Sequence, residues 1–165
     1  MGTLRQQVRR ASRSATRAFS LVELTLVIAI IGILSAMAIP RFGNSIMLRS
    51  VDGAARRIAA DFELARRHAM TASVAQTVRL QNGTDPGYTL VGLQHLDHPT
   101  QPYLVSFAQD CHGVALVSYN VGGDLELVFD MYGVPDSAGQ LVIRAGSHQR
   151  TISIDAQTGR ASVSE

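Results

Sequence analysis

The chain has 165 residues, enough for one domain of ordinary size and too few for two. The composition, 46% hydrophobic and 17% charged, is that of a folded protein and not of a disordered chain. The single cysteine, Cys111, excludes an internal disulfide and does not indicate a redox compartment.

Residues 1–18 hold the basic character of the chain. The formal net charge is +2, and all fifteen Lys or Arg residues are Arg. Five of them precede Ala18, in a segment without acidic residues: Arg5, Arg9, Arg10, Arg13 and Arg17. Without this segment ten Arg face thirteen acidic residues, a balance of −3. The charge distribution therefore predicts a targeting segment and argues against a nucleic-acid-binding protein.

An almost wholly apolar run follows, from Phe19 to Ile39. As a helix it would extend about 32 Å, enough to cross a bilayer once, and the Arg residues before it would keep that end in the cytoplasm. Glu23 lies near the start of the run. A carboxylate in a membrane segment costs roughly 2.5–3.5 kcal/mol, so we expect Glu23 to have a partner and a function.

Two ordinary interpretations leave Glu23 unexplained. The small residues around Met37, in Ala36-Met37-Ala38, fit the end of a secretory signal peptide, and cleavage after Ala38 would release a soluble, β-rich binding protein. The run could instead be an uncleaved signal anchor. Neither interpretation gives the carboxylate a task.

The stretch Ala18-Phe19-Ser20-Leu21-Val22-Glu23, with the apolar run and Pro40 after it, resembles the class III signal of type IV pilins and type II secretion pseudopilins. The resemblance implies that a prepilin peptidase cuts between Ala18 and Phe19 and methylates the new amino group of Phe19. Glu23 would then neutralise the N-terminal amine of a neighbouring subunit during filament assembly, and Pro40 would bend the helix. Ala18 stands where the family usually has Gly, which implies slower cleavage.

The chain beyond Pro40 predicts a second helical stretch over residues 44 to 73. Apolar positions recur there at helical spacing and form one stripe, although Gly53 lowers the helix propensity. The stripe consists of Met47, Val51, Ala55, Ile58, Phe62, Ala65, Ala69 and Ala72. We expect it to pack on the chain's own sheet, because strand-like segments follow at once.

Short, turn-punctuated strand segments predict a β-rich head. They cover residues 77–80, 88–93, 104–108, 114–119, 125–130, 141–144, 150–155 and 160–163. The fold class expected is α+β and type IV pilin-like, with a long N-terminal helix packed on an antiparallel β-sheet head. The segments would be a cytoplasmic leader (1–18), a transmembrane and filament-core helix (19–40), its amphipathic continuation (41–75) and a periplasmic head (76–165).

Three later motifs narrow the resemblance. Leu64-Ala65-Arg66-Arg67-His68-Ala69, Phe129-Asp130-x-x-Gly133 and the tail from Ile152 to Val163 are similar to the GspH/FimT family of minor pseudopilins. Membership would imply a non-enzymatic subunit of a type II secretion pseudopilus, anchored by one pass in a bacterial inner membrane. Its partners would be prepilin peptidase, other pseudopilins or pilins and the inner-membrane assembly platform. The alternative within the resemblance is a minor type IV pilin in pilus assembly or DNA uptake.

We find no catalytic motif and expect no cofactor and no metal. His95, Asp97 and His98 could ligate a metal, but flanking prolines favour a solvated loop. Cys111, between Asp110 and His112, is more typical of a buried cysteine than of a thiolate site. From Arg79 to Glu165 four Arg face nine acidic residues, which argues against nucleic acid as a partner. Arg150 and Arg160 are the candidate contacts if DNA binds.

Overall fold

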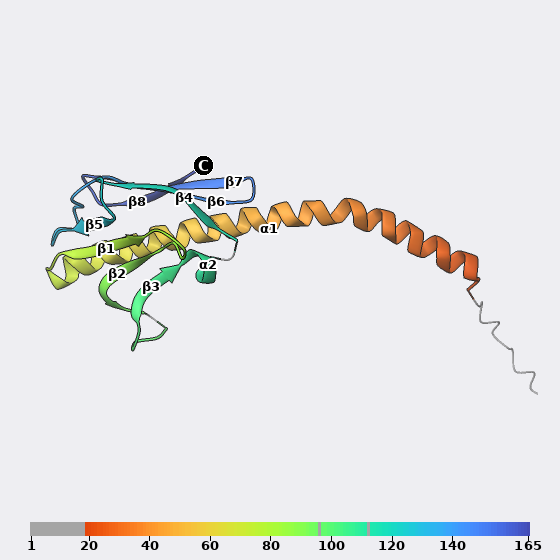
Figure 1. Ribbon diagram of the computed structural model, residues 1–165, viewed down its shortest axis with the longest axis horizontal. Helices are drawn as coiled ribbons and strands as arrows, with labels where there is room; N and C mark the ends of the chain where they lie inside the picture. Colours follow the sequence, from red (N-terminus) through yellow and green to blue (C-terminus); the bar gives the residue numbers. More distant parts are fainter. Residues whose placement is uncertain (1–18, 96, 112) are drawn as a thin grey trace, which may run out of the picture. The chain divides into compact units, whose positions relative to one another are not determined.

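The computed structural model describes residues 19–95, 97–111 and 113–165, with the side chains of 37–42 left out of that description. The chain divides into two compact units at the Pro40–Arg41 peptide. The second unit contains all the strands, and each unit is described by itself below (Figure 1).

Helix α1 (Leu21–Ala72) has 52 residues and continues through both units. It ends where Ser73 adopts a left-handed backbone conformation with φ of 54°, after which the Val74 amide donates to the Ala69 carbonyl at 3.2 Å. The predicted apolar stripe is confirmed at its six central positions, which are buried: Val51, Ala55, Ile58, Phe62, Ala65 and Ala69. Its two end positions, Met47 and Ala72, are exposed instead.

Four strands form the first sheet, in the order β3-β2-β1-β5. They are β1 (Gln76–Gln81), β2 (Gly87–Gln94), β3 (Pro102–Ser106) and β5 (Glu126–Phe129), and all their pairings are antiparallel. The short helix α2 (Phe107–Asp110) follows β3 directly.

Four further strands form the second sheet, in the order β4-β6-β7-β8. They are β4 (Ala115–Val121), β6 (Gly139–Ala145), β7 (His148–Ile154) and β8 (Ala161–Ser164), again all antiparallel. Within the second unit, α1 lies along both sheets (Figure 1).

The predicted fold class is confirmed, since a long helix packs on antiparallel strands, but two details differ. Residues 107–108 are helical and not part of a strand, because the Ser106 hydroxyl accepts from the Gln109 amide and caps α2. The strands also divide into two sheets, because β5 leaves its sequence neighbours β4 and β6 and pairs with β1.

One core joins the helix to both sheets. Its largest fully buried side chains come from α1 and from strands of each sheet: Tyr88, Phe62, Phe107, Phe129, Ile58, Leu90, Leu127, Leu141, Ile143, Ile152, Val51 and Val78. The second half of α1 is therefore part of the head and contributes its central layer.

Candidate functional site

The N-terminal end of α1 carries the residues that the sequence singles out for processing and assembly. Phe19 is 76% exposed and precedes the helix, while Ala18 lies outside the described residues. The Ser20 hydroxyl accepts from the Glu23 amide at 3.1 Å, and the Ser20 carbonyl accepts from the Leu24 amide at 3.1 Å. Glu23 thus lies in the first turn of α1 with its side chain exposed.

The helix beyond Glu23 presents apolar side chains in every direction. All the large apolar residues from Leu21 to Leu34 are exposed, and they include adjacent positions such as Ile30 and Ile31. Adjacent positions point about 100° apart on a helix, so this surface has no polar face. Within the part of the chain that the structure describes, no helix is long and apolar enough to cross a membrane.

Pro40 lies within α1 and is the last residue of the first unit. Its side chain is outside the described part, and the expected helix bend at Pro40 stays a prediction.

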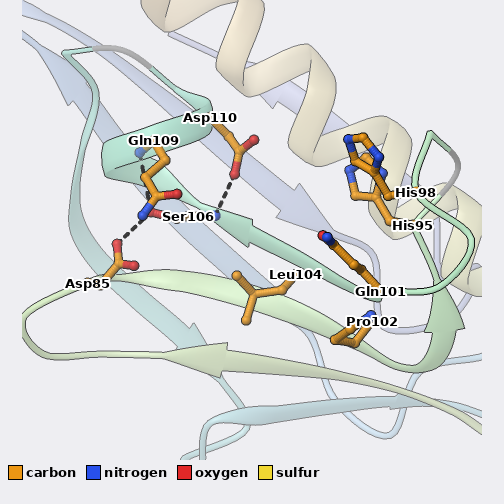
Figure 2. Close-up of a pocket in the computed structure, with 9 residues that line it drawn as sticks. All are labelled: Asp85, His95, His98, Gln101, Pro102, Leu104, Ser106, Gln109 and Asp110. Carbon is orange, nitrogen blue, oxygen red and sulfur yellow. Dashed lines mark hydrogen bonds between the residues drawn. The ribbon is translucent and has the colours of Figure 1, made fainter.

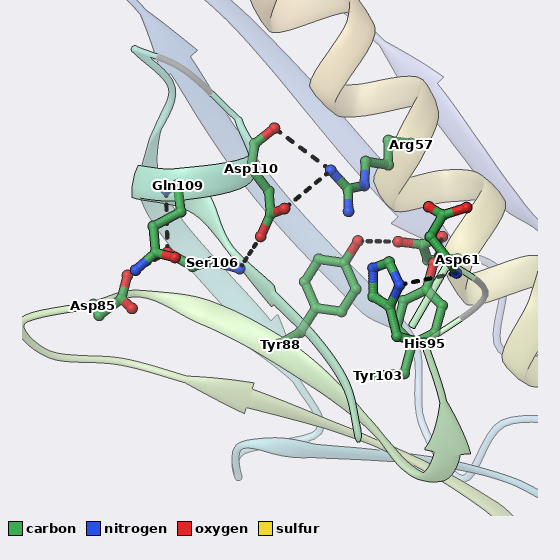
Figure 3. A network of polar contacts seen from close by, with 10 residues as sticks. Arg57, Asp61, Asp85, Tyr88, His95, Tyr103, Ser106, Gln109 and Asp110 are labelled. Atoms are coloured by element: carbon green, nitrogen blue, oxygen red, sulfur yellow. Dashed lines mark hydrogen bonds and ion pairs between the residues drawn. The ribbon is translucent and has the colours of Figure 1, made fainter. Parts of the chain in front are cut away.

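A buried carboxylate joins α1 to the first sheet. Asp61 is 6% exposed and accepts hydrogen bonds from the hydroxyl groups of Tyr88 in β2 and Tyr103 in β3, the latter at 2.7 Å (Figure 3). The β2–β3 register pairs Leu90 with Tyr103, so the two tyrosines lie on the same sheet face. The pairing satisfies a group that would otherwise be costly to bury.

The tyrosines remain hydrogen-bond donors at neutral pH. Burial raises the pKa of the Tyr88 and Tyr103 phenols, and the adjacent Asp61 carboxylate raises both further. Asp61 therefore keeps both donors across the physiological range, and this cluster is a structural tie without a proton-transfer partner of matched pKa.

A second polar cluster surrounds a cavity of about 390 Å³ beside α2 (Figure 2). Asp110 accepts from the Ser106 amide at 2.9 Å and pairs with Arg57 of α1 at 3.6 Å. The Ser106 hydroxyl donates to Asp85 at 2.5 Å. These bonds engage the carboxylates of the cavity wall in fixing the loops around α2.

His95 and His98 line the other side of this cavity (Figure 2). Their ring centroids lie 5.4 Å apart, and His95 also stacks on Tyr103 at 5.3 Å. Among the described residues, no group of three or more His, Cys, Asp or Glu side chains is placed to hold a metal ion. Cys111 is buried, and burial raises the pKa of its thiol, which confirms the interpretation as a core cysteine; His112 lies outside the described residues.

The three later motifs of the sequence converge on one point of the head. A Cβ atom at Gly133 would lie 3.0 Å from the Arg66 side chain, and one at Gly159 would lie 2.9 Å from the same side chain. A Cβ at Gly159 would also overlap the Gly133 carbonyl oxygen and lie 3.3 Å from the Phe129 ring. Helix α1, the loop after β5 and the β7–β8 turn therefore meet where only glycine leaves room.

The two candidate DNA contacts lie at opposite ends of the β7–β8 hairpin. Arg150 pairs with Asp52 of α1 at 2.7 Å and with Glu165 at 3.2 Å, and its side chain is 14% exposed. Arg160 is exposed beside the turn. The register pairs Thr151 with Ser164 and runs toward that turn, so the two Arg residues lie roughly 16 Å apart along the strand direction. The structure does not bring them together.

Sequence reasoning missed Asp61 and its two tyrosines, although a signal was present. Asp61 follows Ile58 by three positions and precedes Phe62, so it falls on the buried face of the helix. An acidic residue at a core position indicates a buried partner. The tyrosine partners could not be identified, because they depend on how β2 and β3 pack on the helix.

The family described as type II transport protein GspH matches residues 54–158, which is more than half of the chain. The chain belongs to the GspH family. The match spans the second half of α1 and the strands up to the β7–β8 turn, and it contains Asp61 and the convergent motifs around Arg66. No curated protein matches.

Two crystal structures of the type IV minor pilin FimU from Pseudomonas aeruginosa have a similar fold. One is 19% identical, with a TM-score of 0.50, and covers 69% of this chain and 92% of FimU. The other crystal form is 18% identical, with a TM-score of 0.52, and covers 71% of this chain and 90% of FimU. This GspH-family chain thus has the fold of a minor pilin and the role of a minor pseudopilin or pilin subunit.

Proposed function

We propose that this chain is a minor pseudopilin of a type II secretion system, and that it assembles into the periplasmic pseudopilus that helps to export folded proteins. The GspH family match over residues 54–158 carries this proposal. Neither the family nor the fold is that of an enzyme, so the function is one of assembly. Its partners are other pseudopilins and the inner-membrane assembly platform.

Processing precedes assembly in this proposal. Prepilin peptidase hydrolyses the Ala18–Phe19 peptide bond, so that water supplies the new carboxylate of Ala18 and the proton of the Phe19 amine, which is then methylated. The sequence pattern around the bond supports this step. The exposed position of Phe19 ahead of the helix also favours access by a peptidase.

The apolar first half of α1 anchors the chain in the inner membrane with the head in the periplasm, and later forms the filament core. An all-apolar helix surface needs lipid or other helices around it, and the exposed residues from Leu21 to Leu34 support this role. In such surroundings Glu23 pairs with the N-terminal amine of a neighbouring subunit. An unpaired carboxylate would be costly there, so the pairing selects insertion beside an existing subunit.

A minor type IV pilin is the second candidate, favoured by the fold shared with FimU. DNA uptake receives less support. Arg150 is engaged by Asp52 and Glu165, and Arg160 lies at the other end of the hairpin. Few cations remain to neutralise phosphates.

The Glu23→Gln substitution tests the assembly role, because it removes the charge and keeps the shape of the side chain. We expect normal cleavage and a loss of at least ten-fold in the subunit recovered in sheared or cross-linked filaments. Thr25→Ala, two residues along the same helix, is the matched control and should assemble normally. A Glu23→Gln chain that enters filaments at the wild-type level would contradict the role of the carboxylate. Release of the chain cut after Ala38 would instead establish the secretory signal peptide.

A further inference from the structure

Ser20 is the N-terminal cap of α1. Its hydroxyl accepts from the Glu23 amide at 3.1 Å, its carbonyl accepts the first helical hydrogen bond from Leu24, and α1 begins at the next residue. Phe19 remains outside the helix. We propose that Ser20 is a positioning residue for the proteolytic step: it stops α1 short of the Ala18–Phe19 bond and keeps that bond available to the peptidase. This inference rests on the processing proposed above.

The sequence before Ser20 shows why a cap is needed. Between Thr3 and Phe19 the chain has neither proline nor glycine, and the residue at the proposed cut, Ala18, has the highest helix propensity of all. Little in the local sequence would prevent α1 from growing toward its N-terminus. A helix through the cut would engage the backbone groups around the bond, whereas peptidases cleave exposed, non-helical segments.

The cap also leaves Glu23 free for its own task. Within the described residues, the contact between Ser20 and Glu23 uses the main-chain amide of Glu23. The carboxylate of Glu23 is not the group that closes the end of the helix. Capping by Ser20 and docking by Glu23 are therefore separable, and substitution at position 20 should affect cleavage before it affects assembly.

A cleavage assay on the full chain, coexpressed with prepilin peptidase and followed by pulse-chase, tests the inference. Loss of a cap shifts a helix-end equilibrium by about five-fold, so Ser20→Ala should slow cleavage by about five-fold. Ser20→Thr and Ser20→Asn, which both cap helices, should be cleaved at nearly the wild-type rate. The precursor labelled at time zero checks that all variants are made equally.

Three outcomes would overturn the inference. Cleavage of Ser20→Ala at the wild-type rate would show that the cap has no effect. Restoration by Ser20→Thr with failure of Ser20→Asn would show that the peptidase reads the hydroxyl group itself. A wild-type chain that is not cut at Ala18–Phe19 would overturn both this inference and the processing proposal, whereas the first two outcomes leave that proposal intact.

The Ala18→Gly substitution provides an independent check by a double-mutant cycle. Glycine lowers helix propensity by about five-fold relative to alanine, so it should itself keep the helix away from the bond. We expect Ser20→Ala to slow cleavage by less than two-fold in the Ala18→Gly background. An undiminished five-fold effect in that background would mean that Ser20 acts independently of the helix end, which contradicts the inference.

Discussion

Asp61 is the residue on which the contact between helix and first sheet depends most. Its carboxylate is buried and receives two tyrosine hydroxyl groups. Truncation to alanine would leave both hydroxyls without their acceptor and open a cavity under the helix.

We predict that Asp61→Ala lowers the free energy of unfolding by about 3 kcal/mol, and that Tyr103→Phe lowers it by about 1 kcal/mol. Thermal and denaturant unfolding of the mature chain in detergent micelles would measure both. Tyr132→Phe is the matched control and should have no measurable effect, because Tyr132 is 73% exposed. Equal stability of the Asp61→Ala chain and the wild type would refute the role of the buried carboxylate.

At the residue scale, the sequence predicted the candidates for processing and assembly but not the residues that hold the head together. Phe19 and Glu23 are recognisable because their pattern is local and continuous in the chain. Tyr88 and Tyr103 acquire their partner only through tertiary packing, across 27 and 42 residues of sequence. Arg150 differs in the same way: its acidic partner Asp52 lies 98 residues away.

At the scale of elements, helical periodicity and turn residues predicted most of the fold. The stripe from Val51 to Ala69 is buried as expected, and each predicted strand segment overlaps an observed strand. The pairing of β5 with β1 was not predictable, because strand length and alternation do not identify a partner. The division into two sheets follows from that one long-range pairing.

The junction of α1, the loop after β5 and the β7–β8 turn depends on glycine at position 159. Its φ is +66°, and a side chain there would overlap the Gly133 backbone. The turn is also held by Asp155, which accepts from the Thr158 hydroxyl at 2.8 Å and from the Thr158 amide at 2.7 Å. These hydrogen bonds hold the pKa of Asp155 below its usual range.

We predict that Gly159→Ala lowers the free energy of unfolding by about 3 kcal/mol, since backbone strain and overlap act together. Gly113→Ala is the matched control: its φ is +75°, but no atom lies within 4 Å of the added Cβ. The control should lose only about 1 kcal/mol, the cost of the left-handed conformation alone. Similar losses in the two variants, measured by the same unfolding experiments, would show that the close approach at Gly159 is unimportant.

At the scale of the whole molecule, the two units of the chain have opposite surfaces. The second unit buries its apolar residues in a core, whereas the first exposes them along the helix from Leu21 to Leu34. This contrast is expected of a subunit that completes its packing in a membrane or filament. The account as a whole therefore depends on the helix from Phe19 being retained in the mature protein.

The N-terminus and intact mass of the membrane-extracted mature protein test that dependence most directly. Our account predicts a chain that begins at Phe19 with a methylated amino group and retains Glu23. A mature chain that begins at Ile39 would have lost both the apolar helix and Glu23, and would contradict the assembly proposal.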